Sequence, residues 1–429
     1  MLKSIILAAG KGTRMKSETP KVLHEIFNKT LLGYVIEGVN DTGMADENIV
    51  IVGHQAEKVE EYINSNYKNA KTVLQSPQLG TGHAVSMAIP LLENFDGEII
   101  ILCGDTPLIT SETIKDFVEF HRREKSDLTV MSAIFDNPAN YGRIIRNPDG
   151  SLNSIVEEKD ATPEQKGINE VNAGIYCLNW AKIKPAFKDL KTNNAQGEYY
   201  LTDIVKWAGE KNGGKSLKTL AYTLKDNEEI FGINSKANLA EAAKLLNKRV
   251  VKKHLDNGVT IIDPDTTWIS PETEIEADTI IYPSCYIEGK NKIGKNCKIG
   301  PFAHLRGDVI LEDNVKIGNF VEVKKTTIKS NTNACHLTYL GDSEIGSGVN
   351  IGAGTITANY NPLTKVKSKT IIKDNAKIGS NSVLVAPVTI EEGANVGAVG
   401  VITKNIPAWA LAITRSPLKI IEGWVKSKK

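Results

Sequence analysis

Cysteine is scarce in this chain, and its few copies lie far apart. The 429 residues include five cysteines, and no two of them form a C-x-x-C pair. Structural zinc sites and disulfide frameworks need closely spaced cysteines, so the sequence argues against both kinds of site. Isolated cysteines are compatible with a reducing compartment, and we predict a cytoplasmic location.

The chain also lacks an excess of charge and any long apolar run. Its formal net charge is +1, which predicts neither nucleic acid nor an anionic membrane as a partner. The apolar run from Ser4 to Ala9 is too short for the core of a signal peptide, and no run approaches the length of a membrane span. With 41% hydrophobic and 24% charged residues, the composition is typical of a globular protein of two or three domains.

Residues 1–230 alternate short apolar runs with helical patterns. The runs at 5–8, 49–52 and 99–102 predict buried strands, and the spacing at 31–39 and 84–92 predicts helices between them. This alternation indicates a Rossmann-like α/β domain with a parallel sheet that is covered on both faces. Ligands of such domains bind beyond the carboxyl ends of the strands.

A six-residue period replaces this alternation near residue 269. Ten aliphatic residues follow one another at this spacing: Ile269, Ile275, Ile281, Ile287, Ile293, Ile299, Leu305, Leu311, Ile317 and Val323. The period returns from Ile372 to Ile402. It is the hexapeptide signature of a parallel β-helix, in which the aliphatic side chains point inward and small residues form the corners.

The hexapeptide period is interrupted at 323–345 and at 351–372, where we expect surface loops that carry a binding face. Residues 238–254 have a helical pattern. They predict a linker helix, although a last helix of the first domain would give the same pattern. The resulting domain limits are 1–230, a linker at 231–254, and 255–429.

Three local features suggest chemistry. A glycine-rich segment, residues 7–15, follows the first predicted strand and carries Lys11 and Arg14. Its backbone N–H groups would suit phosphate, although a tight turn alone would explain the glycines. Asp105 follows the strand at 99–102 and suits Mg²⁺, although it could simply cap a turn. His336 lies in the first interruption and would suit a general base, although a lone histidine is more often structural.

Several motifs in combination resemble one family. They are L-A-A-G-K-G-T-R-M at 7–15 with Pro20-Lys21, L-G-T-G-H-A at 79–84 after Gln75, G-D at 104–105, Y-G-R at 141–143, I-V-E-E-K-D at 155–160, N-A-G at 172–174, and N-A-Q-G-E-Y-Y-L-T-D at 194–203. The first three resemble sugar-1-phosphate nucleotidyltransferases. Together they resemble the bifunctional N-acetylglucosamine-1-phosphate uridyltransferase/glucosamine-1-phosphate acetyltransferases, over nearly the whole chain.

This resemblance implies an order of reactions and a set of residue roles. Acetyl-CoA would acetylate glucosamine 1-phosphate, and UTP with Mg²⁺ would then convert the product to UDP-N-acetylglucosamine. Nucleotide and sugar would be bound by Leu7, Ala8, Ala9, Gly10, Gly12, Arg14, Lys21, Gln75, Gly80, Thr81, Gly142, Glu157, Asn172 and Asn234. Asp105 and Asn234 would ligate the metal.

For acetyl transfer, the resemblance implies His336 as the general base, oriented by Glu322. Arg306, Glu322, Lys324, Tyr339 and Asn350 would form the glucosamine 1-phosphate site, and Ala353, Asn359, Tyr360, Ser380, Ala398 and Arg415 would line the acetyl-CoA groove. It also implies a homotrimer whose acetyltransferase sites are shared between chains, and a left-handed β-helix.

The sequence departs from the family pattern in two places. The run from Ile269 to Pro301 is shorter than expected, as though one or more coils were missing, and the loop at 361–369 is two residues longer. The family lysine of that loop corresponds to Lys365 or to Lys367. A rival interpretation is a nucleotidyltransferase of other specificity, whose β-helix only holds an oligomer together. A scaffold without activity is disfavoured by the intact glycine segment and Asp105.

Overall fold

The computed structural model describes residues 1–210, 217–414 and 417–426. The chain forms two compact units, residues 1–243 and 244–429, and their boundary lies within one helix, α9 (Lys236–Asp256). No helix in the described ranges is long and apolar enough to cross a lipid bilayer.

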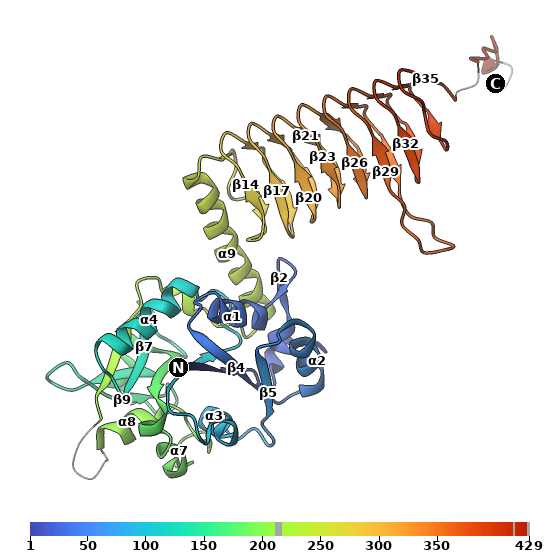
Figure 1. Ribbon diagram of the computed structural model, residues 1–429. Helices are drawn as coiled ribbons and strands as arrows, with labels where there is room; N and C mark the ends of the chain where they lie inside the picture. The colour runs from blue at the N-terminus through green and yellow to red at the C-terminus, as the bar shows by residue number, and fades with distance from the viewer. Residues whose placement is uncertain (211–216, 415–416, 427–429) are drawn as a thin grey trace. The chain divides into compact units, whose positions relative to one another are not determined.

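The first unit is built on one mixed sheet (Figure 1). Its strands, in sheet order, are β11 (Thr219–Thr223), β7 (Leu128–Ile134), β10 (Glu170–Asn179), β6 (Glu98–Cys103), β1 (Leu2–Leu7), β4 (Ala45–Val52) and β5 (Ala70–Leu74); a hairpin of β8 (Arg143–Arg146) and β9 (Leu152–Val156) joins through β10. The parallel sheet that the sequence predicts is present in β6, β1, β4 and β5, but β10 runs antiparallel to both β6 and β7, and the β8–β9 hairpin is antiparallel as well. The predicted strands at 5–8, 49–52 and 99–102 correspond to β1, β4 and β6.

Helices cover both faces of this sheet, as predicted. One core contains side chains of α1 (Leu31–Asn40), α2 (Ala56–Asn66) and α4 (Ser111–Arg123). The other contains side chains of α3 (Thr81–Ser86), α6 (Trp180–Ile183), α7 (Ala186–Asp189) and α8 (Asp203–Glu210). The predicted helix at 84–92 is divided into α3 and a 3₁₀ turn at Ile89–Leu92, because Pro90 has no N–H with which to continue an α-helix. The shorter elements are β2 (Glu25–Ile26), β3 (Lys29–Thr30) and α5 (Pro163–Lys166).

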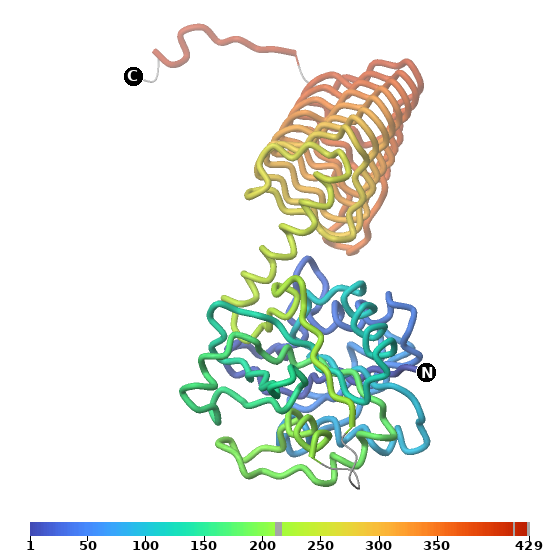
Figure 2. The backbone as a smooth tube through the Cα atoms, turned by 90° about the vertical axis from the view of Figure 1, so that its left-hand side faces the viewer, coloured from blue at the N-terminus to red at the C-terminus, as the bar shows by residue number. Residues whose placement is uncertain are grey.

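The second unit is a stack of coils with three parallel sheets as its sides (Figures 1 and 2). The first sheet contains β12 (Thr260–Ile261), β15 (Ile280–Ile281), β18 (Lys298–Ile299), β21 (Lys316–Asn319), β24 (Asn333–His336), β27 (Asn350–Ile351), β30 (Lys377–Ile378), β33 (Asn395–Val396) and β35 (Leu411–Ala412). The second contains β13 (Trp268–Ile269), β16 (Tyr286–Glu288), β19 (His304–Arg306), β22 (Glu322–Lys324), β25 (Tyr339–Gly341), β28 (Ile356–Ala358), β31 (Val383–Val385) and β34 (Val401–Ile402). The third contains β14 (Glu274–Ile275), β17 (Asn291–Ile293), β20 (Val309–Leu311), β23 (Thr327–Ile328), β26 (Ser343–Ile345), β29 (Thr370–Ile372) and β32 (Val388–Ile390).

The predicted inward positions are confirmed. All ten aliphatic residues of the first hexapeptide run are buried in one core. Their register is regular, since Ile281, Ile299 and Ile317 pair in successive strands. Burial of one aliphatic side chain per strand removes apolar surface from water in every coil, which stabilises the stack.

The glycines after the aliphatic residues do not form the corners, contrary to the prediction. A Cβ atom at Gly318 or Gly379 would overlap the backbone of the next coil, so glycine permits close approach of the strands there. The corners instead contain residues with positive φ, among them Asn296, Asn314 and Asn331. Asparagine tolerates this left-handed conformation better than most side chains.

The two interruptions differ in kind. At the first, the coil is shortened rather than opened: Leu311 pairs with Ile328 and Val323 with Leu340, seventeen positions apart instead of the usual eighteen. The predicted loop is therefore absent at the first interruption. At the second, Ile345 pairs with Ile372, and the added residues form a projecting hairpin in which Tyr360 bridges Lys367.

The carboxyl-terminal half of α9 covers the first coil of the β-helix. Val250 and Val251 belong to the core of the β-helix. The buried Asn247 donates from Nδ2 to the carbonyl of Thr267 at 2.8 Å and accepts from the N–H of Ile269 at 3.0 Å. Asn247 therefore satisfies backbone groups that have no preceding coil to pair with.

Candidate functional site

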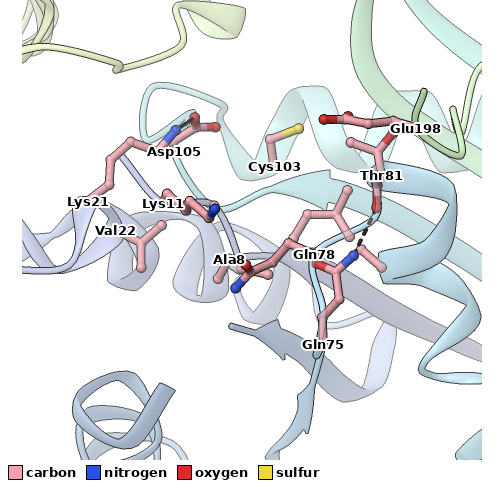
Figure 3. A pocket seen from close by; sticks show the side chains of 15 residues that line it. Ala8, Lys11, Lys21, Val22, Gln75, Gln78, Thr81, Cys103, Asp105 and Glu198 are labelled. Atoms are coloured by element: carbon pink, nitrogen blue, oxygen red, sulfur yellow. Dashed lines mark hydrogen bonds and ion pairs between the residues drawn. The ribbon is translucent and has the colours of Figure 1, made fainter. Parts of the chain in front are cut away.

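A cavity of about 420 Å³ lies at the carboxyl ends of β1 and β6 (Figure 3). Nine predicted site residues line it: Leu7, Ala8, Ala9, Gly10, Lys21, Gln75, Gly80, Thr81 and Asp105. Since ligands of α/β sheets bind at this edge, the cavity is where the topology predicts a nucleotide. Arg14 and Gly12 do not line the cavity. Arg14 is exposed on the turn Thr13–Met15.

Gly12 shapes the entrance of the glycine-rich segment. It adopts a left-handed conformation with φ 59°, and an added Cβ would lie 2.7 Å from the Cβ of Lys21. A larger residue at position 12 would therefore displace Lys21 from the cavity. The glycine serves close packing against Lys21 as well as a turn.

Lys21 connects the two proposed metal ligands. Its Nζ donates to Asp105 Oδ2 in a short contact, and to Asn234 Oδ1 at 3.2 Å. The N–H of Ile233 donates to the carbonyl of Asp105 at 3.0 Å, which keeps position 234 beside the aspartate. The ammonium group already places a positive charge between two hard oxygen atoms, so this pair fits Mg²⁺.

The rest of a magnesium coordination shell would come from elsewhere. Within the described residues, no group of three or more His, Cys, Asp or Glu side chains is placed to hold a metal ion. Mg²⁺ commonly takes one or two protein ligands and completes its shell with phosphate oxygens and water. The site therefore fits a metal that is bound together with a nucleotide.

Gln75 and Gly80 form the far wall of the cavity. Gln75 is 3% exposed, and its Nε2 lies 2.9 Å from the carbonyl oxygen of Gly80 and 3.1 Å from His83 Nδ1. Gly80 has φ 113°, and a Cβ there would lie 2.6 Å from the carbonyl oxygen of Tyr199. A fixed amide and a close-packed glycine suit recognition of a flat base.

Six lining residues were not among the predicted ligands: Lys11, Val22, Gln78, Ala84, Cys103 and Glu198. Glu198 belongs to the 194–203 motif, and Cys103 directly precedes Gly104-Asp105, so both were close to recognised signals. Burial raises the pKa of the Cys103 thiol to about 12. The thiol therefore stays protonated near neutral pH and does not act as a nucleophile.

Gly142, Glu157 and Asn172 come together outside the lining of that cavity. The N–H of Asn172 donates to the carbonyl of Gly142 at 2.8 Å, and its Nδ2 donates to the hydroxyl of Tyr176 at 2.9 Å. Glu157 accepts from Thr202 Oγ1 at 3.3 Å. Burial raises the pKa of the Glu157 carboxyl, and Asp160 and Asp203 nearby act in the same direction.

We predict that Glu157→Gln stabilises the first unit while weakening uridyl transfer. Because folding raises the pKa of Glu157, the folded state holds its proton more tightly than the unfolded state does. The free energy of unfolding therefore falls as pH rises through the folded-state pKa. At pH 8 the variant should gain about 2–4 °C in melting temperature, and its KM for the sugar phosphate should rise. Thermal unfolding at pH 4 and pH 8 measures this, and an equal difference at both pH values would contradict it.

The acetyltransferase candidates lie on the outer surface of the β-helix. Glu322 pairs with Tyr339 in adjacent coils, and Arg306 and Lys324 lie at the ends of β19 and β22. His336 ends β24, where it is exposed. Three successive coils, which contain β19, β22 and β24–β25, therefore bring Arg306, Lys324, His336 and Tyr339 to neighbouring positions. Asn350 follows in β27 of the next coil, two residues beyond the corner that ends at Gly348.

Two contacts differ from the predicted arrangement of these side chains. Arg306 Nη1 donates to Glu322 Oε1 at 2.7 Å, and this hydrogen bond raises the pKa of Arg306. The His336 ring contacts Asn319 instead, with Nδ1 and Oδ1 3.2 Å apart. Within the described residues, Glu322 therefore accepts a hydrogen bond from Arg306 and does not orient His336.

The proposed acetyl-CoA residues form a column of small side chains. Ala353, Ser380 and Ala398 each follow a glycine, in three successive coils, and backbone hydrogen bonds join Asn381 to Ala353 and Val399 to Ser380. Asn359 is 9% exposed and lies 3.4 Å from the Tyr339 hydroxyl, whereas Tyr360 is exposed at the base of the hairpin. Arg415 lies outside the described residues.

Comparison with known proteins identifies a family for each of the two units. Residues 3–221 match the nucleotidyl transferase family, and residues 292–325 match the bacterial transferase hexapeptide family. The bifunctional protein GlmU of Thermoanaerobacter pseudethanolicus is 45% identical over 460 positions, which cover 100% of this chain and 98% of that protein. Those of Caldanaerobacter subterraneus subsp. tengcongensis and Acetivibrio thermocellus are 45% and 44% identical with the same coverage. The chain belongs to the GlmU family.

Membership in the GlmU family confirms the predicted function and fold class. The chain is a bifunctional transferase of UDP-N-acetylglucosamine synthesis, with uridyltransferase and acetyltransferase activities, and its C-terminal unit is a left-handed β-helix. Its substrates are small molecules that include a nucleotide and acetyl-CoA. The alignments contain 460 positions against 429 residues here, so these GlmU relatives have positions that this chain lacks.

Proposed function

We propose that uridyl transfer takes place in the cavity at the ends of β1 and β6. The main support is that Lys21 and Asp105 line this cavity and that Lys21 donates hydrogen bonds to both Asp105 and Asn234. The sugar phosphate attacks the α-phosphorus of UTP in line, and pyrophosphate leaves. Asp105 and Asn234 would hold Mg²⁺, which neutralises phosphate charge when bound. This reaction needs positioning and charge neutralisation but no protein nucleophile.

Different residues around the cavity bind the phosphates, the uracil and the sugar. Lys21 leaves Asp105 and Asn234 to bind phosphate, while the N–H groups at Gly10 to Gly12, with Arg14, donate hydrogen bonds to the triphosphate. Gln75, Gly80 and Thr81 recognise uracil. Gly142, Glu157 and Asn172 hold the sugar. The backbone hydrogen bond keeps Asn172 beside Gly142, and the half-buried carboxylate of Glu157 accepts hydrogen bonds from the sugar hydroxyl groups.

Acetyl transfer is assigned to the outer face of the β-helix around His336. His336 removes a proton from the ammonium group of glucosamine 1-phosphate, whose nitrogen then attacks the thioester carbonyl and expels CoA as a thiol. Arg306 and Lys324 supply positive charge for the phosphate, with Glu322 fixing Arg306. Tyr339 and Asn350 complete the sugar site, and Ala353, Asn359, Tyr360, Ser380, Ala398 and Arg415 bind acetyl-CoA.

We further propose a homotrimer in the cytoplasm. A ridge of apolar corner residues, Phe302, Phe320 and Leu337, lies beside His336 and is 52–61% exposed. The two phenylalanine rings stack with centroids 5.2 Å apart, and all three residues have positive φ. Exposed apolar side chains on strained backbone are typical of an interface, and the resemblance assigns it to further copies of this chain. The five cysteines, all free thiols, support a reducing location.

The double variant Phe302→Ser, Phe320→Ser should dissociate the trimer and remove acetyl transfer, while uridyl transfer continues. Sedimentation equilibrium measures the assembly, and free thiol release measures acetyl transfer. Ile310→Ser, which replaces an exposed apolar residue outside the ridge, is the matched control. A trimeric double variant would show that the ridge is not the interface.

The whole proposal is tested by one coupled assay. Glucosamine 1-phosphate, acetyl-CoA, UTP and Mg²⁺ should yield UDP-N-acetylglucosamine, with one CoA thiol and one pyrophosphate released per product. Failure to form thiol, with pyrophosphate release intact from N-acetylglucosamine 1-phosphate, would favour the rival in which the β-helix only joins subunits.

A further inference from the structure

The backbone around His336 is fixed by the coil before it. Asn319 ends β21 and is the register partner of His336 in β24. The N–H of Leu337 donates to the carbonyl of Asn319 at 3.0 Å, and the Thr338 hydroxyl donates to the carbonyl of His336 at 2.6 Å. The imidazole therefore projects from a backbone that is held on both sides.

Gly318 brings these two coils unusually close. A Cβ atom at position 318 would overlap the carbonyl group of Cys335, so only glycine fits there. Since Asn319 follows Gly318 and His336 follows Cys335, the close approach places the two side chains next to each other. The contact between the His336 imidazole and the Asn319 amide is thus determined by the packing of the two coils.

The side-chain contact itself joins His336 Nδ1 to Asn319 Oδ1 at 3.2 Å. An amide oxygen can only accept a hydrogen bond, so in this arrangement Nδ1 carries the proton of the neutral imidazole. Nε2 then carries the lone pair. Glu322 does not compete for this role, because Arg306 holds its carboxylate at 2.7 Å.

We propose that Asn319 is a positioning residue for acetyl transfer, which fixes the tautomer of His336 so that Nε2 faces the substrate ammonium as the base. This rests on the proposed role of His336. Asn319 contributes by keeping the reactive nitrogen unprotonated and the ring oriented before substrate arrives. The proton from the ammonium group moves to Nε2, giving an imidazolium whose Nδ1–H still donates to Asn319.

The test combines kinetics with the nitrogen NMR spectrum of the imidazole in the full-length protein. Asn319→Ala should lower kcat for acetyl transfer about 3- to 10-fold, the effect of losing one net hydrogen bond, with KM for both substrates unchanged. The ¹⁵N shifts of His336 should move from the Nδ1–H form toward a tautomer mixture. Asn319→Asp, which keeps an acceptor oxygen, should retain the Nδ1–H form. Lys316→Ala, on the same strand, is the control.

The outcomes separate this inference from the role on which it rests. If His336→Ala keeps its acetyl transfer, the proposed base is wrong. If His336→Ala is inactive but Asn319→Ala keeps both kcat and the Nδ1–H spectrum, only the positioning role is wrong. A ¹⁵N spectrum that shows the Nε2–H tautomer in the unaltered protein would also overturn the positioning role, because the Asn319 amide would then present its nitrogen to the ring.

Discussion

Asp105→Ala is expected to abolish uridyl transfer and to leave acetyl transfer at its normal rate. Asp105 is the charged member of the proposed metal pair, and it holds Lys21 in the cavity. Its removal deletes a metal ligand and releases the lysine at the same time. Loss of a preorganised group that neutralises phosphate charge typically costs about 10²- to 10³-fold or more, so pyrophosphate release from UTP and N-acetylglucosamine 1-phosphate should fall below detection.

A matched variant separates the metal role from general loss of an ion pair. Glu47 also pairs with lysines in the same sheet, Lys3 at 2.8 Å and Lys71 at 2.5 Å, but it does not line the cavity. Glu47→Gln should therefore keep uridyl transfer. Binding of Mn²⁺ in the presence of UTP, followed by electron paramagnetic resonance, should be lost in Asp105→Ala alone. An Asp105→Ala protein that still forms UDP-N-acetylglucosamine with metal dependence would refute the assignment.

The β-helix was the most predictable part of the chain, because one short-range rule determines it. An aliphatic residue every six positions gives the inward side chains of the regular coils, and the ten of the first run were identified, whereas Ile328, Ala334 and Leu340 in the first interruption were not. The rule did not reveal that a coil can be one residue shorter and still pair with its neighbours in the stack. The shortened coils at 311–345 keep their parallel pairing, since a corner absorbs the missing position.

The positions of several strands of the α/β unit were predictable, but the direction in which β10 joins the sheet was not. Local patterns locate β1, β4 and β6, but they contain nothing about the direction of β10, which lies more than 60 residues beyond β6 in the chain. Antiparallel insertion of β10 positions Asn172 beside Gly142, a contact between segments that only the folded sheet brings together.

The site was predictable as a list of residues and less so as a set of contacts. The glycine segment, Gln75 and Asp105 converge because each follows a strand of one sheet edge. The partner of His336 depends instead on which side chain of the preceding coil faces it. Asn319 and Glu322 are both within one coil of His336, and only the close approach at Gly318 decides between them.

His336→Ala is expected to remove acetyl transfer while uridyl transfer continues. The ammonium group of glucosamine 1-phosphate cannot attack a thioester until it has lost a proton, and a positioned general base contributes about 10²- to 10⁴-fold. The rate of CoA thiol release should fall by that factor. The His336 side chain is exposed and forms a hydrogen bond with Asn319, so its removal should not unfold the coil.

Two companion variants show which role is lost. Glu322→Gln should act through Arg306, raising KM for glucosamine 1-phosphate more than it lowers kcat, because the 2.7 Å contact joins these two side chains. Lys298→Ala, an outward residue of the same sheet two coils from His336, should leave both activities unchanged. Near-normal thiol release by His336→Ala would exclude the imidazole as the base. Equal loss of both activities would mean that His336 maintains the structure, since the uridyl transfer residues belong to the other compact unit and have no other reason to respond.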